Sequence, residues 1–375
     1  MDEFIDLLDP DSGLSIDDSA VFKARHNLAY SAFQDMNQKS LDFWFDHGSV
    51  KLWHDYQIID VDGSTLRLPN TEDILDCYDP NKDSKGNPQG PPLARLNLLY
   101  DPLNQLCLSA KLDNLRVSEL NQLVDQNWFW KSGQLVIADR HYDAFWLFAW
   151  LLERKVDFCI RLKKDQRRQV IKDFLMEGCS EKIVTVTPGR GARKKCRLHS
   201  VATDPITLRL IRVQLPSGEI EILATSVLDQ KKIKFTDFGD LYHLRWPIEE
   251  KIKQLKFRVN IENWTGKSPF TVLQDVYAKL FGCNLMVWMA NGLETEIEER
   301  SEKRSYDCQI NWAHALSSFN RFLPRLFFGR ALHTNLNRLH DLFMKCLSPI
   351  RPNRKYDRKH KSHKREFFMC YKFCC

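Results

Sequence analysis

The segment at residues 242–256 reads YHLRWPIEEKIKQLK and decides how the rest of the chain is interpreted. Tyr242, Arg245, Glu249 and Lys256 are three, four and seven residues apart in it, so one α-helix would carry them on one stripe. A carboxylate between two cations and a phenol suits a metal-bound phosphate, because the carboxylate can hold the cation while the basic groups bind the phosphate oxygens. The alternative is an ordinary amphipathic helix with a salt-bridged face.

Pro247 interrupts this simple helix. A proline inside a helix removes a hydrogen bond and pushes the preceding residue, here Trp246, toward extended geometry. We therefore expect Glu249 and Lys256 on one helical face, with Tyr242 and Arg245 supplied by the preceding turn or helix.

The same segment resembles the Tyr-Arg-Glu-Lys signature of bacterial insertion-sequence transposases of the DDE class, and residues 245–250 (RWPIEE) match its wording closely. The resemblance implies two upstream aspartates, each ending a strand. Asp62 follows the run QIIDV at 57–61, and Asp139 follows the run QLVIA at 134–138. A carboxylate at the carboxyl end of a strand projects from the sheet edge where ligands bind in open α/β sheets. The three motifs place the resemblance over roughly residues 20 to 290.

The pattern between Trp53 and Leu162 predicts an α/β core. Strands are expected at 57–61, 64–68, 94–100, 105–111, 134–138 and 158–162, with helices at 117–127 and 144–155. A loop rich in Pro, Gly, Asn and Lys at 79–92 is expected to be mobile. Three strands, a helix, a strand and a helix resemble the order of the ribonuclease-H-like fold, a mixed sheet flanked by helices.

Residues 163–232 are predicted to be a β-rich insertion. After a basic helix, alternating runs at 182–187, 197–202, 207–214 and 219–226 are separated by turn residues at 188–191 and 216–218. The resembled family carries a β-rich insertion at this point, between its second Asp and its Glu.

Helical regions are expected on both sides of the core. The predicted organisation is an N-terminal helical region (1–50), a catalytic core (51–292), a C-terminal helical region (293–350) and a basic tail (351–375). Ser15 is expected to cap a helix at 16–28, followed by a helix at 30–45. The core should end with a long helix from Pro269 to Asn291. A charged linker at 294–304 then precedes helices at 312–322 and 331–347, and the tail should be disordered until it meets a partner.

Charge is unevenly distributed although the formal net charge is only +6. Residues 1–46 carry a balance of −7, residues 161–197 of +8 and residues 351–372 of +7. Clustered bases suit a polyanion, whereas a solvated face is the alternative. We expect Arg193, Lys194 and Lys195 to bind the DNA backbone. The resemblance implies that the N-terminal region helps to bind element ends, but its acidity equally favours a helical brace packed on the core.

Cysteine usage and hydropathy indicate the compartment. Eleven cysteines without a Cys-x-x-Cys pair favour reduced thiols in a cytosolic protein, although His360, His363, Cys370 and Cys374 offer a zinc alternative with unusual spacing. The N-terminus lacks a basic leader, and the longest clean apolar run, 144–152, is too short to span a bilayer. We expect a cytoplasmic, nucleoid-associated bacterial protein without a membrane anchor.

The candidate chemistry is phosphodiester cleavage at a two-metal site. Asp62, Asp139 and Glu249 would hold two Mg²⁺ ions, with Mn²⁺ as a substitute, because carboxylates are the hard oxygen ligands that Mg²⁺ prefers. Tyr242, Arg245 and Lys256 would bind phosphate. The resemblance implies a transposase that also transfers the freed 3′ ends to double-stranded target DNA, acting on element ends as a homodimer.

Two alternatives to an active transposase remain. One is a nuclease of similar fold without strand transfer, and the other is a repressor-like relative that binds element ends without cutting them. The resemblance also implies that Trp246 helps to extrude a base beside the cut, against the alternative of a core aromatic. No Trp lies between 150 and 246 to serve as a stacking platform, which puts a hairpin intermediate in doubt.

Overall fold

The computed structural model describes residues 17–78, 90–163, 169–215, 218–328 and 331–351, and the chain divides into two compact units. Unit 1 contains residues 1–47, 68–75 and 254–375, and unit 2 contains residues 48–67 and 76–253. No helix in the described ranges is long and apolar enough to cross a membrane. The eight cysteines within those ranges are all free thiols.

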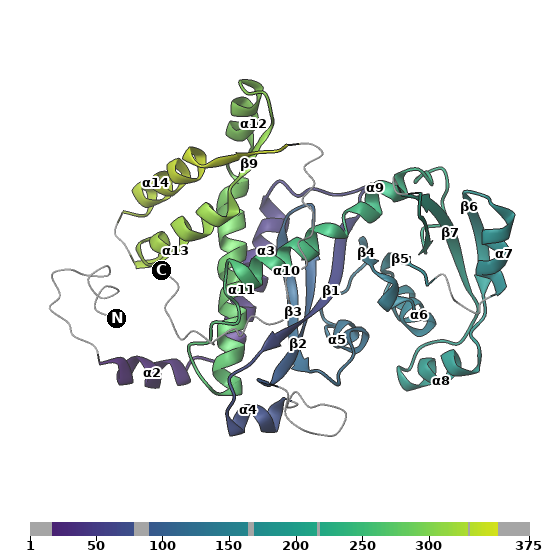
Figure 1. Cartoon of the computed structure of the whole chain (residues 1–375), viewed down its shortest axis with the longest axis horizontal. Coiled ribbons are helices and arrows are strands. Elements are labelled where there is room, and N and C mark those ends of the chain that lie inside the picture. The colour runs from purple at the N-terminus through teal and green to yellow at the C-terminus, as the bar shows by residue number, and fades with distance from the viewer. Residues whose placement is uncertain (1–16, 79–89, 164–168, 216–217, 329–330, 352–375) are drawn as a thin grey trace. The chain divides into compact units, whose positions relative to one another are not determined.

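Unit 2 is built on one mixed sheet of eight strands in the order β3-β2-β1-β4-β5-β8-β7-β6 (Figure 1). The strands are β1 (Gln57–Arg67), β2 (Leu93–Asp101), β3 (Leu106–Asn114), β4 (Gln134–Ala138), β5 (Asp157–Arg161), β6 (Glu181–Val186), β7 (Ile206–Gln214) and β8 (Ile220–Thr225). β4 runs parallel to β1 and β5, and every other neighbouring pair is antiparallel. The predicted α/β, ribonuclease-H-like mixed sheet is therefore confirmed.

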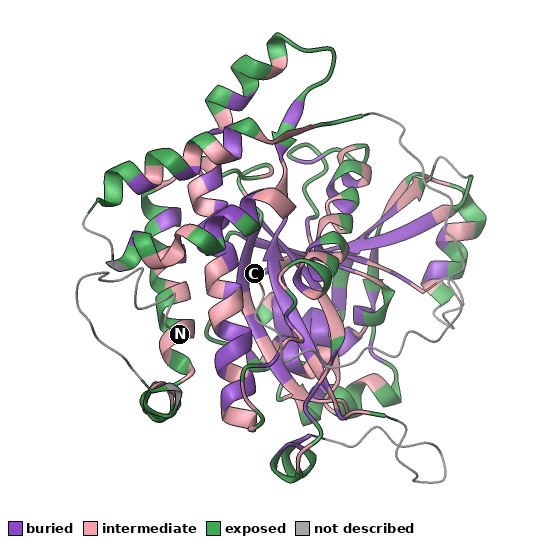
Figure 2. Ribbon diagram, turned by 60° about the vertical axis from the view of Figure 1, so that its left-hand side comes forward, coloured by how far each residue is buried: buried purple, intermediate pink, exposed green. Residues whose placement is uncertain are grey.

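Helices cover both faces of this sheet. Successive side chains of a strand point to opposite faces, so an apolar strand has side chains to bury on both. Helix α9 (Asp237–His243) packs Phe238, Leu241 and Tyr242 into a buried cluster with Ile58 and Ile137 of the strands. On the other face, α6 (Phe145–Glu153) stacks Phe148 on Phe158 of β5, with ring centroids 4.8 Å apart. The strands between these layers are mostly buried (Figure 2).

Strand β1 is longer than predicted. It continues through Asp62 and Gly63 to Arg67, so the two strands expected at 57–61 and 64–68 are one. The reason is its two neighbours: β4 pairs with β1 over 57–61, and β2 pairs with it over 60–67. Asp62 therefore lies inside a strand, at the position where its parallel neighbour ends.

The predicted insertion is partly correct. Strands β6, β7 and β8 occur close to the expected runs, but they extend the central sheet through the β5–β8 pair. The strand expected at 197–202 and the turn expected at 188–191 are wrong, since residues 190–198 form helix α8 (Arg190–Leu198) with Gly189 as its N-cap. The helix buries Cys196 and stacks His199 on Trp146 of α6, with ring centroids 3.7 Å apart.

The remaining helices of unit 2 connect these strands. They are α5 (Glu119–Asp125), the short 3₁₀ helix η1 (Arg140–Tyr142), α7 (Gln169–Glu177) and the first part of α10 (Trp246–Phe257). The helices predicted at 117–127 and 144–155 correspond to α5 and α6.

Unit 1 is helical and centred on α11 (Pro269–Asn291), whose predicted bounds are confirmed. Its other elements are α2 (Asp18–His26), α3 (Ser31–His47), α12 (Glu294–Glu302), β9 (Cys308–Ile310), α13 (Trp312–Phe328), α14 (Leu332–Lys345) and β10 (Leu347–Pro349), with α4 (Glu72–Cys77) following β1 in the chain. Helix α3 packs along α11 through aromatic pairs, including Phe43 and Trp288 with ring centroids 5.5 Å apart. Tyr30, just before α3, stacks on Tyr277 of α11 at 5.9 Å.

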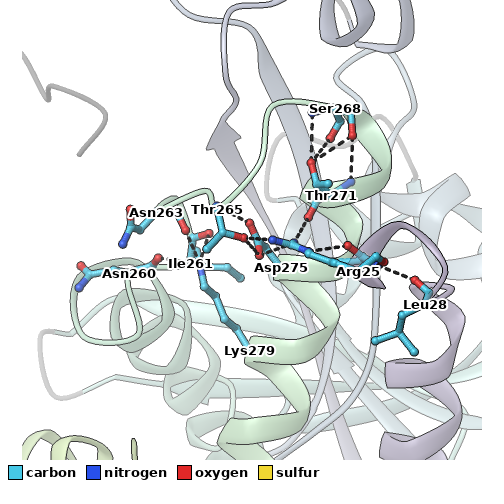
Figure 3. A network of polar contacts seen from close by, with 11 residues as sticks. Arg25, Leu28, Asn260, Ile261, Asn263, Thr265, Ser268, Thr271, Asp275 and Lys279 are labelled. Atoms are coloured by element: carbon cyan, nitrogen blue, oxygen red, sulfur yellow. Dashed lines mark hydrogen bonds and ion pairs between the residues drawn. The ribbon is translucent and has the colours of Figure 1, made fainter. Parts of the chain in front are cut away.

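A polar network joins α2 to the first turns of α11 (Figure 3). Arg25 pairs with Asp275 at 2.9 Å, donates to the Gln274 side chain at 2.7 Å and also reaches the Thr265 hydroxyl. Asp275 in turn accepts from the Thr265 N–H at 2.7 Å. Lys279 donates to backbone carbonyls of the preceding loop, including that of Asn263 at 2.6 Å. The α10–α11 loop is therefore fixed to both helices by charged hydrogen bonds.

Some expectations outside the sheet are corrected, and others concern residues that the structure does not describe. Residues 294–302 form α12 and not a linker, and the β9–β10 pair was not predicted. Helix α2 begins after Asp17, whose carboxylate accepts from the Ser19 N–H at 3.2 Å, and not after Ser15. Ser15, the loop at 79–89, the tail from 352 onward and its zinc candidates lie outside the described residues.

Candidate active site

The register of two parallel strands brings Asp62 and Asp139 to the same edge. Val61 and Ala138 form the last partners of the β1–β4 pair, and each aspartate is the next residue in the chain. Asp139 caps η1, where its carboxylate accepts from the His141 N–H at 2.8 Å, and Asp62 accepts from the Gly63 N–H at 2.8 Å. Both predicted aspartates are thus held by backbone contacts at the carboxyl end of β4.

The electrostatics of Asp62 reflect this crowding. The pKa of Asp62 is raised to about 6, chiefly by burial, with the negative charges of Asp139 and Glu119 contributing to the rise and the Gly63 N–H and the charge of Arg245 opposing it. A buried carboxyl that also lies near other carboxylates is a group that a cation would stabilise in its ionised form.

The Tyr-Arg-Glu-Lys residues come from two consecutive helices and not from one. Helix α9 ends at His243, and α10 begins at Trp246 with Pro247 in its first turn, where a missing N–H costs nothing. Between them, Arg245 donates from Nη2 to Oε1 of Glu249 at 2.7 Å, and the two side chains are 13% and 31% exposed. The expected division between a helix and its preceding turn is confirmed.

Two aromatic side chains flank this ion pair differently. Tyr242 is 7% exposed within the apolar cluster beneath α9, and burial raises the pKa of its hydroxyl, which finds no hydrogen-bond partner among the described residues. Trp246 is 49% exposed, with the Arg245 guanidinium 5.2 Å from its ring centroid. The core-aromatic alternative for Trp246 is therefore wrong. Lys256 lies in the last turn of α10, in the part of that helix assigned to unit 1.

Two further carboxylates at the site were not predicted. Asp60 is 0% exposed, and burial raises its pKa, with Arg245 acting in the opposite direction and Asp62 and Glu249 adding to the rise. The sequence did hold a signal for it, because an acid in the middle of the apolar run QIIDV is unusual for a buried strand. Glu119 of α5 gave no such signal.

Glu119 reaches the site because residue 63 is glycine. A Cβ on Gly63 would overlap the Glu119 carboxyl group. Glu119 also lies 3.9 Å from Nε of Arg95 and 4.0 Å from Nε2 of His141. The Gly63 position therefore lets an acidic side chain approach the backbone beside Asp62.

Helix α8 carries the predicted DNA-binding bases Arg193, Lys194 and Lys195. All three are exposed, and within the described part of the chain none forms an ion pair. The positive charge of Lys195 contributes, after burial, to lowering the pKa of His199, the residue that stacks on α6. Lys195 is thus on the flank of α8 that faces α6.

The donor chemistry beside Asp62 fits a hard divalent cation, because Asp62, Asp139 and Glu119, whose charges meet there, are all carboxylates. The side chains are not arranged around a common point: no group of three or more His, Cys, Asp or Glu within the described ranges is placed to hold a metal ion. One reason is visible, since Glu249 is paired with Arg245.

Comparisons with known proteins agree with the motifs. The model of the family described as "Transposase DDE domain" matches residues 53–285. The transposase InsG for insertion sequence element IS4 of Escherichia coli (strain K12) is 26% identical over 301 residues, an alignment covering 77% of this chain and 66% of that protein, slightly less than two thirds. Among solved structures, the piggyBac transposase synaptic complex with hairpin DNA has a TM-score of 0.41 at 12% identity, covering 96% of this chain and 77% of the other. With its family match extending across β1, β4 and the Arg245–Glu249 segment, this chain belongs to the DDE transposase domain family.

Proposed function

We propose that this chain is a metal-dependent DNA transposase that cleaves element ends and transfers the freed strands to a target. The observation that carries the proposal is the β1–β4 register, which sets Asp62 beside Asp139 where the Glu119 and Asp139 charges act on it. Glu249 enters from α10, one turn after Arg245. The family match supports divalent metal use, and Mg²⁺ is the proposed ion, with Mn²⁺ as a substitute.

Each side chain has a proposed task. Asp62, Asp139 and Glu249 would hold two divalent cations, which when bound activate the attacking water and stabilise the leaving oxygen. Arg245 would bind a phosphate oxygen of the cleaved strand, because a guanidinium matches phosphate geometry with paired donors. Trp246, half exposed beside Arg245, would contact a base next to the cut. Lys256 and Tyr242 remain predicted phosphate contacts.

Double-stranded DNA at the element ends and at the target is the proposed partner, bound by a homodimer. Helix α8 supports this partner, since its exposed bases have no ion pairs within the described residues. Such a surface gives salt-dependent, sequence-independent affinity for the DNA backbone.

The test combines cleavage and binding measurements on the full chain. Asp62→Asn, Asp139→Asn and Glu249→Gln should each lower Mg²⁺- or Mn²⁺-dependent cleavage of end-sequence DNA by more than about a hundredfold, since even residues behind metal ligands cost 10–100-fold. DNA affinity should persist, because removing a negative charge cannot weaken attraction to a polyanion. Glu250→Gln is the matched control: it neighbours Glu249, its side chain is 72% exposed, and it pairs with Lys253.

The alternatives give different results in the same assays. Wild-type protein that binds end DNA but cuts with neither metal would contradict the enzymatic proposal and favour a repressor-like relative. Cleavage without joining of 3′ ends to a target would favour a plain nuclease. Loss of fold, binding and cleavage together in the three variants would indicate that the carboxylates are structural.

A further inference from the structure

Asp60 is a buried carboxylate that no hydrogen bond within the described residues stabilises. It is 0% exposed in the middle of β1, and neither of its carboxylate oxygens has a hydrogen-bond partner in the described part of the chain. Burying a carboxylate in this state is costly, and buried polar groups are nearly always paired. We therefore expect the Asp60 carboxylate to acquire a hydrogen-bond partner in another state of the protein.

Asp60 lies on the face of β1 that α9 covers, because Ile58, two residues earlier in the strand, packs in one cluster with Tyr242 of α9. Arg245, three residues after Tyr242, is the cation that acts on Asp60 there. Its positive charge is the main electrostatic attraction acting on the Asp60 carboxylate, whereas Asp62 and Glu249 repel it. In the present arrangement the guanidinium donates to Glu249 from Nη2. A guanidinium has five N–H donors, so Arg245 has donors to spare where Asp60 has unused acceptors.

The Arg245–Glu249 pair conflicts with a metal-binding role for Glu249. The guanidinium occupies an acceptor oxygen of the carboxylate and places a positive charge where a divalent cation would have to approach. Glu249 can serve a cation fully only when Arg245 has moved to another acceptor.

We propose that Asp60 is that acceptor: a positioning residue that draws the Arg245 guanidinium away from Glu249 when Glu249 binds a cation. The exchange conserves charge pairing. The Arg245 guanidinium moves from the Glu249 carboxylate to the Asp60 carboxylate, and the divalent metal ion takes its place at Glu249. The proposal rests on the proposed function, since it assumes that Glu249 is a metal ligand. It assigns Asp60 a role through Arg245 and no contact with metal or DNA.

A double-mutant cycle read out by Mn²⁺ binding tests the exchange. Mn²⁺ affinity is measured by calorimetry and by the electron paramagnetic resonance of free Mn²⁺ on the full chain, in wild type, D60N, R245Q and D60N/R245Q. We expect D60N to weaken Mn²⁺ binding about tenfold, the lower end of the effect for residues behind metal ligands. R245Q should strengthen it, and in the R245Q background D60N should change the affinity by less than about twofold.

Several outcomes would overturn the exchange. An equal loss from D60N in both backgrounds would show that Asp60 acts on the cation directly, and unchanged affinity in D60N would show that it does not act on the site. Asn has the shape of Asp without its charge, so D60N should melt at or above the wild-type temperature without metal. A lower melting temperature together with a loss in both backgrounds would make Asp60 a structural residue.

The proposed function fails separately. E249Q should abolish the Mn²⁺ site and E250Q should leave it intact. Mn²⁺ binding that is insensitive to E249Q would contradict the metal-ligand role of Glu249 and the exchange together. Mn²⁺ binding that is lost in E249Q but unaffected by D60N would contradict the exchange alone.

Discussion

The proposed DNA contact of α8 should be directional, because the helix places its bases on defined sides, and two adjacent lysines can test it. At about 100° per residue, Arg190, Arg193, Lys194 and Arg197 occupy positions i, i+3, i+4 and i+7 and fall within one stripe about 100° wide, with Arg193 and Lys194 at its two borders. Lys195 lies about 100° round from Lys194 and on the flank that faces α6. Lys194→Ala and Lys195→Ala remove the same charge from neighbouring exposed positions.

The expected magnitude follows from the length of the stripe. Seven residues of helix rise about 10 Å, which spans roughly three phosphates at about 3.4 Å of axial rise per nucleotide. Each phosphate contact contributes about 0.9 to the slope of log K against log salt. Lys194→Ala should therefore reduce the slope by about 0.9, and Lys195→Ala should leave it nearly unchanged. The triple variant of Arg193, Lys194 and Lys195 to Ala should reduce it by about 1.8, because two of its residues lie on the stripe.

The assay is fluorescence anisotropy of labelled duplex DNA from about 50 to 200 mM salt, the range over which such contacts change affinity strongly. Circular dichroism of each variant should confirm that the helix remains. Equal slope changes for the two lysines would refute the stripe, and an unchanged slope in the triple variant would refute DNA binding by α8.

Three other predictions concern stability and the exposed tryptophan. Arg25→Ala should lower the free energy of unfolding of unit 1 by about 2–3 kcal/mol, because it removes charged hydrogen bonds. The control is Lys23→Ala at an exposed position of the same helix, which should change this free energy by less than about 0.5 kcal/mol. Equal effects of the two variants in urea denaturation would contradict the network of Figure 3. Gly266→Ala should lower the free energy of unfolding by about 1–3 kcal/mol, because its Cβ would overlap the buried Thr271 side chain. Gly191→Ala in α8 would meet open space, so its effect on the free energy of unfolding should be neutral or stabilising by up to about 1 kcal/mol. A neutral Gly266→Ala would refute the close approach of Thr271 to this glycine. Trp246→Ala should leave the melting temperature nearly unchanged but lower end-DNA cleavage, with Trp246→Phe retaining more activity; a large loss of thermal stability would return this residue to a packing role.

The sequence by itself determined the parts of this protein that depend on local pattern. Apolar runs before Asp62 and Asp139 predicted two strands, and both strands form. The β1–β4 register places the two aspartates side by side at the carboxyl end of β4, although β1 continues past Asp62 and does not end there. Pro247 predicted the break between the helix that carries Tyr242 and the helix that carries Glu249, because proline acts through its own backbone geometry.

Tertiary structure decided what local pattern leaves open. Residues 190–198 become a helix because Cys196 and His199 find α6 to pack against, although Pro188 and Gly189 favour a turn. The strands of the insertion join the central sheet because β8 meets the free edge of β5.

The least predictable feature is the environment of the acids. The apolar run marks Asp60 as unusual, but it does not reveal that Asp60 has no hydrogen-bond partner within the described ranges whereas a backbone N–H holds Asp62. Whether a carboxylate is exposed, paired or isolated depends on side chains that arrive from distant strands and helices, here Arg245 above all. The sequence thus predicted Asp62, Asp139 and Glu249, whereas Asp60, Glu119 and the way in which all these charges interact became visible only in the packed structure.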